Sequence, residues 1–411
     1  MTSNYDLKPL TQVCEVLSGG TPKTTVPAFW NGNIPWASVK DFNIDSRWFS
    51  KTEKSISQLG LESCSSVLLE PGDLVISARG TVGAVGQCKM RTSFNQSNYG
   101  LRAKSGLSKN DYLYYALGYA KRALIGDTHG GMFDTITRDT LDRLLIPVPT
   151  LKVQEQIAEI LGSLDMKIAV NNALSKTLED IAQTIFKSWF IDFDPVKAKM
   201  VGEKPAGMDD TTAALFPDSM EESELGLIPS GWQVKLLGDL VTPKKGKTIT
   251  RASCVDGDVP VVAGGLQPAY FHNTANVLQP VITVSASGAN AGYVRLYLED
   301  IWASDCSYIN SEITQTVHFW YLFLSRNQEL IYGMQQGAAQ PHIYPSDLMR
   351  LKVSYPNSID AVLKFEETVT PLFLQIGALE RQNESLRSLR DSLLPRLISG
   401  ELQIPKEMLA S

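Results

Sequence analysis

The longest uninterrupted helical pattern in the chain spans residues 152–193 and constrains the fold more than any other feature. Its apolar residues recur every three or four positions, with no proline among them, which is typical of an amphipathic helix. They are Ile157, Leu161, Leu164, Ile168, Leu174, Leu178, Ile181, Ile185 and Trp189. Such a helix would be roughly 60 Å long at about 1.5 Å per residue. Because ordinary helices average only about 11 to 12 residues, the pattern predicts a spacer.

A second long helix is expected near the end of the sequence. Leucines recur there at seven-residue intervals, and a strict heptad repeat requires a helical partner. Asn171 and Asn383 each fall on an apolar stripe, where asparagine fixes the register of paired helices. We expect the two helices to pair with each other, or their stripes to bind a partner, through Leu164, Ile168, Asn171, Leu178, Leu372, Leu379, Asn383, Leu386 and Leu393. The simpler alternative is that each helix belongs to the core of its own domain.

The sequence outside the two helices repeats. Residues 74–80 (Leu-Val-Ile-Ser-Ala-Arg-Gly) match residues 282–288 (Ile-Thr-Val-Ser-Ala-Ser-Gly) at an offset of 208, and residues 130–149 match 337–356 at 207. Each β-rich block is then followed by its long helix. Since both matches occur in the same order, we interpret the chain as a tandem duplication.

The repeat divides the 411 residues into five segments. We expect a first globular domain at 1–150, a spacer helix at 151–193, a linker or loosely packed crossover at 194–230, a second globular domain at 231–357, and a second spacer helix with a tail at 358–411. Within the first domain, strands are expected at 74–77 and 145–148, a helix at 111–124 and a helical turn at 139–145.

Composition is that of a soluble globular protein, with 43% hydrophobic and 20% charged residues. No apolar run is long enough to span a membrane, and residues 1–10 lack the features of a signal peptide. We therefore expect a cytoplasmic protein. The five scattered cysteines predict reduced thiols, because they form no C-x-x-C pair. The net charge of −6 is uneven: residues 151–230 hold 14 acidic and 7 basic side chains, so the globular blocks are neutral to weakly basic.

Several motifs together resemble the specificity subunit of type I restriction-modification enzymes, and the resemblance covers essentially the whole chain. They are Gly-Asp-Leu-Val-Ile-Ser at 72–77, Arg-Gly-Thr-Val-Gly at 79–83, Ile-Pro-Val-Pro at 146–149 followed by Gln-Glu-Gln-Ile-Ala at 154–158, Ser-Trp-Phe-Ile-Asp-Phe-Asp-Pro at 188–195, and Ile-Pro-Ser-Gly-Trp at 228–232. The second block departs from the pattern: Pro280 and Val281 replace the Gly-Asp turn, and Phe-Glu-Glu at 365–367 stands where the first helix has Glu-Gln.

The resemblance implies an α+β fold: two mixed α/β target recognition domains in pseudo-twofold arrangement, joined by two long antiparallel coiled-coil helices. It implies that each domain reads one half of a split double-stranded DNA site and that the helices set the gap. The implied partners are two methyltransferase subunits and, in the full complex, motor-nuclease subunits. The chain itself would perform no chemistry, and we expect no cofactor and no metal.

Candidate DNA-contacting residues are those with side chains suited to base edges or phosphates near the repeated turn. In the first block they are Arg79, Thr81, Lys89, Arg91, Thr92, Asn95, Gln96 and Asn98. In the second block they are Ser287, Asn290, Tyr293 and Arg295, with Lys244, Lys245, Lys247 and Arg251 as a phosphate-positioning cluster. Any one of them could instead be an ordinary solvated loop residue. The loops at 130–135 and 337–342 are further candidates, or plain connections.

Two other functions remain open from the sequence: a self-contained DNA-modifying enzyme, and a helical scaffold without DNA contact. The enzyme is disfavoured because no Asn-Pro-Pro-Tyr-like methyltransferase motif occurs and the four histidines lack metal-ligand spacing. Lys-Gly-Lys-Thr at 245–248 resembles the end of a phosphate-binding loop, but Val241 occupies the position of its leading glycine. The aromatic cluster Phe186, Trp189, Phe190 and Phe193 is interpreted as packing under the neighbouring domain, with a partner surface as the alternative.

Overall fold

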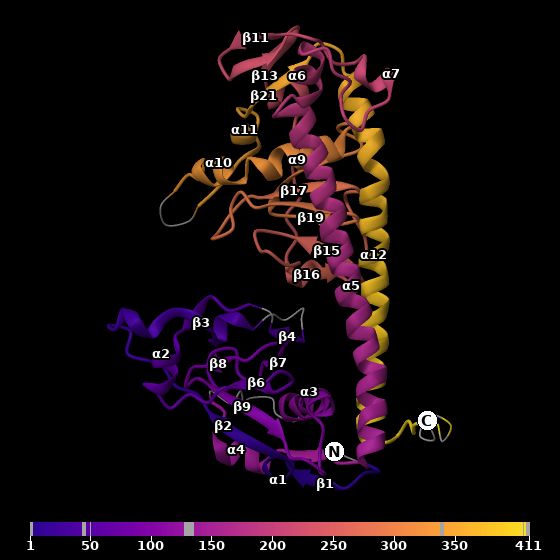
Figure 1. Cartoon of the computed structure of the whole chain (residues 1–411). Helices are drawn as coiled ribbons and strands as arrows, with labels where there is room; N and C mark the ends of the chain where they lie inside the picture. Colours follow the sequence, from indigo (N-terminus) through magenta and orange to yellow (C-terminus); the bar gives the residue numbers. More distant parts are fainter. Residues whose placement is uncertain are drawn as a thin grey trace. The chain divides into compact units, whose positions relative to one another are not determined.

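The fold consists of two compact units, Met1–Asn171 with Gln382–Ser411 and Asn172–Arg381. The structure is a computed structural model that describes residues 3–42, 47–49, 51–126, 135–337, 341–405 and 407. Two 40-residue helices, α5 (Leu151–Phe190) and α12 (Asp360–Ser399), are continuous through the unit boundary, so each unit contains a part of both (Figure 1). No helix among the described residues is long and apolar enough to cross a membrane.

The two long helices pack against each other within each unit. In the first unit, Asn171 donates a hydrogen bond to Asn383 at 2.8 Å, and Arg390 forms an ion pair with Asp165 at 2.7 Å. In the second unit, the rings of Phe186 and Phe365 lie 5.7 Å apart. Residue numbers fall along α12 as they rise along α5, so the helices are antiparallel, as predicted. The two predicted asparagines are both buried.

The first unit carries a head of two sheets. A five-stranded sheet has the order β2-β9-β6-β7-β4, a three-stranded sheet has the order β5-β3-β8, and β1 pairs with β10. The elements are β1 (Leu7–Pro9), α1 (Leu10–Val13), β2 (Cys14–Ser18), η1 (Pro27–Phe29), β3 (Trp30–Ala37), η2 (Val39–Asp41), β4 (Trp48–Phe49), β5 (Lys54–Ile56), α2 (Gln58–Glu62), β6 (Leu74–Ser77), β7 (Val85–Cys88), β8 (Ser93–Phe94), β9 (Asn98–Ala103), α3 (Asn110–Gly126), α4 (Arg138–Arg143) and β10 (Leu145–Pro147).

The second unit carries a head with the same plan. Its sheets have the orders β14-β20-β17-β18 and β16-β15-β19, and β13 pairs with β21. The elements are α6 (Asp194–Met200), α7 (Asp210–Ala213), β11 (Met220–Ser223), β12 (Gly226–Pro229), β13 (Trp232–Leu236), α8 (Leu237–Leu240), β14 (Lys244–Lys245), η3 (Arg251–Ser253), β15 (Val259–Val262), β16 (Tyr270–His272), β17 (Val281–Ser285), β18 (Val294–Tyr297), β19 (Trp302–Ala303), β20 (Cys306–Asn310), α9 (Val317–Arg326), α10 (Gln328–Gly333), α11 (Pro345–Leu348) and β21 (Lys352–Pro356).

The duplication extends to the pairing of individual residues. The central strands β6 and β9 pair Leu74 with Leu101, and β17 and β20 pair Ile282 with Ile309, both at the offset of 208 seen in the sequence. The parallel contact of β3 with β8 recurs as β15 with β19. Since a slip of one residue would turn every side chain to the other face of the sheet, a shared register shows that the two heads have one fold. The predicted α+β fold with two mixed domains is confirmed.

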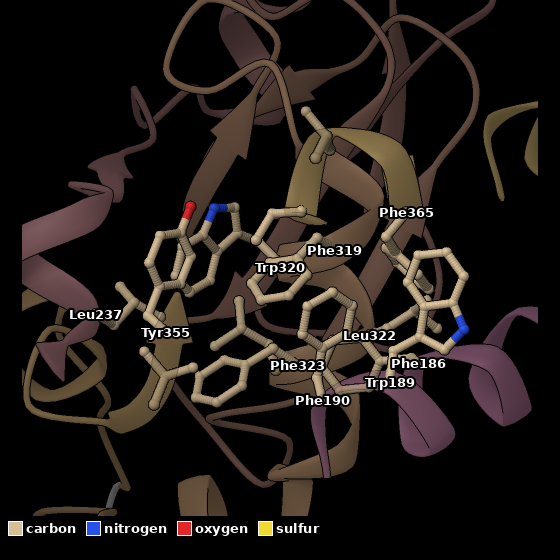
Figure 2. Close-up of a cluster of buried hydrophobic side chains, with 14 of the residues drawn as sticks. Phe186, Trp189, Phe190, Leu237, Phe319, Trp320, Leu322, Phe323, Tyr355 and Phe365 are labelled. Carbon is tan, nitrogen blue, oxygen red and sulfur yellow. The ribbon is translucent and has the colours of Figure 1, made fainter. Parts of the chain in front are cut away.

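Each head packs onto its part of the helix pair through an apolar core. In the second unit, Phe186, Trp189 and Phe190 of α5 meet Phe319 of α9 and Phe365 of α12 (Figure 2). All five side chains are at most 7% exposed. Burying a large side chain contributes roughly 1.5–3 kcal/mol, so this cluster anchors the head. The predicted packing role of these aromatics is what the structure shows.

Residues 194–230 differ from the loosely packed crossover that their prolines and acidic residues predicted. Val196, Phe216 and Ile228 are each at most 3% exposed and belong to the core of the second unit. The ring of Phe216 lies 5.4 Å from Trp189 at the end of α5. The segment is therefore an ordered part of the second unit. Its composition predicted a loosely packed segment, but a few buried apolar side chains suffice to order it.

The predicted apolar stripe of the first long helix is only partly buried. Ile157, Leu161 and Ile168 are buried, whereas Leu174 and Ile181 are 42% and 43% exposed. A two-helix pair buries a narrow seam on each helix, so residues at the edge of the stripe remain in solvent. The helix also ends at Phe190, three residues before the predicted end, and Phe193 adopts a left-handed conformation with φ of 55°.

Candidate nucleic-acid interface

The turn between β6 and β7 presents the first group of predicted residues. Arg79 and Thr81 are exposed there. Gly80 and Gly83 have φ of 77° and 74°, a conformation that glycine adopts readily. Beneath the turn, the Ser77 hydroxyl accepts the backbone N–H of Ala84 at 3.0 Å and donates to the Thr81 carbonyl. Hydrogen bonds of Ser77 therefore fix the backbone of the turn, and its two polar side chains are exposed to solvent.

Two neighbouring segments meet this turn at the same end of the sheet. The backbone N–H of Ala78 donates to Ser97 at 2.8 Å, and that of Gly20 donates to Phe94 at 2.9 Å. The Thr21 hydroxyl bonds to the Gln96 side chain. We refer to Thr21, Arg79, Thr81, Asn95 and Gln96 as the first turn edge. Of this set the sequence missed Thr21, which reaches the turn on a segment far away in the chain.

The remaining first-block candidates lie elsewhere. Lys89 and Arg91 follow β7 at the opposite end of the sheet, and Arg91 is already paired with Glu70 at 2.9 Å. Thr92 is 1% exposed and donates to a local carbonyl at 2.8 Å. Asn98 is also 1% exposed, and its amide donates to Asn95 at 2.9 Å. These two buried residues support the fold rather than the surface, so they are left out of the turn edge.

The second head builds a corresponding turn between β17 and β18. Gly288 and Gly292 have φ of 81° and 89°. The Gly292 N–H donates to Ser285 at 2.8 Å, as the Gly83 N–H donates to Ser77 at 2.8 Å. The turn is one residue longer than the first and displays Asn290 and Tyr293, both half-buried. Its framework is thus shared, whereas its side chains are different.

Neighbouring segments again join the turn. The Ser287 hydroxyl donates to Asp305, and Arg295 donates to the Leu266 carbonyl at 2.9 Å while its guanidinium lies 4.6 Å from the Tyr297 ring centre. Arg295 therefore holds the 263–269 loop, which brings the exposed Gln267 to this end. We define the second turn edge as Lys247, Gln267, Ser287, Asn290 and Tyr293. Gln267 was not predicted, and nothing in its local sequence distinguishes it.

The predicted basic cluster of the second head lies on and after the outer strand of its sheet. Lys244 and Lys245 form β14, Lys247 follows, and Arg251 begins η3; all four are exposed. Among the residues that the structure describes, none of the four has an ion-pair partner. The Trp302 indole donates to the Lys247 carbonyl at 2.8 Å. Unpaired exposed cations on a fixed strand suit contacts to phosphates.

Gly246 has a structural explanation that the resemblance to a phosphate-binding loop obscured. A Cβ at this position would lie 2.3 Å from the Ser304 carbonyl oxygen, and one at Gly19 would lie 2.1 Å from the Asn95 carbonyl oxygen. Both heads thus bring two backbone segments into a contact that only glycine permits. The glycine belongs to the frame that supports the turn edge.

The loops at 130–135 and 337–342 can be placed only in part. Residues 130–134 and 338–340 lie outside the described residues. Of the flanking positions, the Gly288 N–H donates to the Pro341 carbonyl at 3.1 Å, and the backbones of Ser287 and His342 form an isolated β-bridge. The end of the second loop therefore joins the second turn edge.

Three of the five cysteines are buried, and Cys64 and Cys254 are half-buried. Burial raises the pKa of the Cys14, Cys88 and Cys306 thiols to about 12, so these thiols stay protonated at neutral pH. No group of three or more potential metal ligands occurs among the described residues. The two heads therefore have one topology, and each has a supported edge of hydrogen-bonding side chains.

Comparison with known proteins identifies the family. A family model described as the type I restriction modification DNA specificity domain matches residues 2–180 and 229–362. The chain therefore belongs to the type I restriction modification DNA specificity family. Members are non-catalytic DNA-recognition subunits of restriction systems, and the predicted family and non-catalytic role are confirmed.

Individual relatives match from about two thirds to nearly all of this chain. The MjaIX specificity subunit of Methanocaldococcus jannaschii is 26% identical over 98% of this chain and 94% of its own. The HindI specificity subunit of Haemophilus influenzae is 27% identical over 68% of this chain and 73% of its own. The crystal structure of the S subunit from M. genitalium, at 16% identity, shares the fold with a TM-score of 0.58 over 96% of each chain.

Proposed function

We propose that this chain selects the DNA sequence on which a type I restriction-modification complex acts, with each head reading one half of a bipartite target. The observation that carries the proposal is the matched pair of turns. Their glycines and serines are equivalent, but Arg79 and Thr81 face solvent in one and Asn290 and Tyr293 line the other. One framework with two sets of hydrogen-bonding groups is what two readers of different sequences require.

The side chains of the turn edges suit base edges in the major groove. An arginine such as Arg79 can form two hydrogen bonds to guanine, and a side-chain amide such as that of Gln96 or Asn290 can do so to adenine. Each such pair discriminates against the wrong base by about 1–3 kcal/mol. Lys244, Lys245, Lys247 and Arg251 would contact phosphates, which adds affinity that falls with salt but carries no sequence information.

The long helices would set the gap between the half-sites and carry the catalytic partners. Half-sites read from one face of DNA are about 34 Å apart, one helical turn, and α5 is long enough to span that distance at about 1.5 Å per residue. Exposed apolar residues remain on the pair after the helices have packed: Met166 at 64%, Val170 at 51% and Leu374 at 68%. We propose that such residues contact methyltransferase subunits, which join motor-nuclease subunits in the full complex.

Methylation mapping tests this function. The chain is co-expressed with its methyltransferase subunits in a host that lacks this activity, and methylated positions are mapped genome-wide. We expect two short defined sequences separated by a fixed number of unspecified bases. A single uninterrupted motif would contradict the two-reader proposal. Expressing the chain alone is the control, and methylation or cleavage by it alone would instead support a self-contained enzyme.

A further inference from the structure

Each head is tied to the long helices by a tyrosine whose hydroxyl reaches a carboxylate on α5. In the first unit, Tyr115 of α3 is 2% exposed and donates to Asp165 at 2.6 Å. In the second unit, Tyr321 of α9 donates to Glu179. Burial is the largest cause that raises the pKa of both phenols, so each stays a proton donor at neutral pH. Neither bond is needed to complete a strand, a helix cap or a turn edge.

The carboxylate of Asp165 joins three elements. One oxygen accepts from Tyr115 of α3, and the other accepts from Arg390 of α12 at 2.7 Å. Arg47 donates to the same tyrosine at 3.3 Å from the head side. Tyr115, Asp165 and Arg390 line a cavity of about 500 Å³ between α3 and the helix pair, whose wall includes Thr81 of the first turn edge. α3 and the first turn edge thus border the same cavity.

A second polar tie holds the start of each head helix. In the first unit, the Gln154 side chain accepts the Lys109 backbone N–H at 3.1 Å beside the start of α3. Gln154 and Asp165 are eleven residues apart on α5, or roughly 16 Å. Two polar contacts that far apart fix the orientation of α3 relative to α5. The apolar packing between them does not, because it is non-directional. Removal of the tyrosine bond leaves the polar contacts at the start of α3, with Gln154 and in the Lys109–Glu155 ion pair at 2.7 Å, about which α3 can turn.

In the second unit, two polar contacts with different residues also join the head helix to the long helices. The Glu366 carboxylate of α12 accepts the backbone N–H groups of His318 and Phe319 at 3.0 Å each, at the start of α9. Tyr321 then ties α9 to α5 through Glu179. The head helix is thus held at one point on each long helix.

From these contacts we infer that Tyr115 and Tyr321 are positioning residues that fix the angle of each head on its helices and so make the complex selective for one gap length. This inference rests on the proposed function, because gap selectivity has meaning only for a bipartite target. The reading side chains are separate from both tyrosines. Loss of either hydroxyl should therefore relax the gap while leaving the half-site sequences unchanged.

The test uses the complete methyltransferase complex with wild-type chain, Tyr115→Phe and Tyr321→Phe. Methylation rates are measured on DNA carrying the mapped half-sites with the gap lengthened or shortened by one base pair. Matched controls are Tyr112→Phe and Tyr270→Phe. These hydroxyls donate to Pro147 at 2.8 Å and to Ile249, both within their own heads. We expect each positioning variant to lose about tenfold of the preference for the correct gap, as loss of a hydrogen bond to a charged group gives, and the controls to keep it.

The outcomes separate the inference from the proposed function. A wild-type complex that ignores gap length would refute the bipartite function itself. A sharp wild-type preference that both positioning variants retain would overturn the inference alone. Equal relaxation by the controls would also overturn it, because a general loss of stability would then be the cause. If a Tyr→Phe variant does not fold, Asp165→Asn and Glu179→Gln replace it, since they keep an acceptor but remove its charge.

Discussion

Arg79 and Arg91 stand close together in the sequence, but the fold gives them different surroundings. Arg79 lies exposed on a glycine-supported turn, whereas Arg91 is paired with Glu70 at the other end of the same sheet. Strand β7 lies between them and carries the chain from the turn to the other end of the sheet. Residue type alone therefore assigned both to DNA, and only the topology distinguishes a candidate base contact from a surface ion pair.

The Arg79→Ala substitution should relax sequence preference at one base pair of one half-site. Loss of a two-bond contact to guanine lowers discrimination there by about 1–3 kcal/mol. The methylated sites of the variant complex can be mapped as for the wild type. Arg91→Ala is the matched control and should leave the motif unchanged. A motif altered equally by both variants would remove the turn edge from the reading surface.

A substitution at Gly246 tests whether the Lys-Gly-Lys-Thr segment needs glycine for a close approach of two backbone segments. Gly246→Ala should destabilise the second unit by about 1–3 kcal/mol, because the new Cβ would meet the Ser304 carbonyl. Gly333→Ala in α10 is the control, since no atom lies within 4 Å of its Cβ position, and it should be neutral or slightly stabilising. Urea denaturation monitored by tryptophan fluorescence measures the difference. Equal stability of the two variants would show that the close approach at Gly246 is absent.

At the scale of elements, periodicity and repetition were the reliable signals. The strand at 74–77 and the helix near 111–124 are present as β6 and α3, and the repeat at offset 208 reappears as a shared register of strands. Periodicity detects a burial pattern that is local in sequence. It could not show that the edge of the α5 stripe stays exposed, because that depends on how narrow the contact with α12 is.

The candidate site was less predictable than the fold. The sequence located the turn at Arg79 and its repeat, because glycine spacing is local. It could not bring Thr21 or Gln267 to the turn edges, since these residues arrive on segments far away in the chain. It also predicted Asn98 to be a surface residue. In the structure Asn98 is buried at the start of β9, where it pairs with Ser77 of β6. Tertiary neighbours decide such cases.

The duplication also explains where the two heads can differ. In the first head, Arg102 on β9 pairs with the buried Asp73 at 2.6 Å. The register places Asn310 and Val281 at the same positions of the second head, so this ion pair is absent there while the sheet is retained. Apolar packing and strand pairing thus preserve one framework through changes in polar contacts. Such tolerance would permit the side chains that we propose read DNA to diverge independently in each half.

At the scale of the whole molecule, the account depends on two readers carried by one pair of helices. Removal of one heptad from each helix keeps the facing residues in phase and shortens the pair by roughly 10 Å. Residues 172–178 of α5 and 375–381 of α12 are suitable, because their removal spares Asp165, Glu179 and the Asn171–Asn383 bond.

The decisive measurement is methylation mapping of the complex that contains this shortened chain. We predict that both half-site sequences stay the same and that the gap between them decreases by about three base pairs, since base pairs are about 3.4 Å apart. Half-sites with altered bases, or an unchanged gap in a folded and active complex, would contradict the central claim that the helices set the distance between two separate readers.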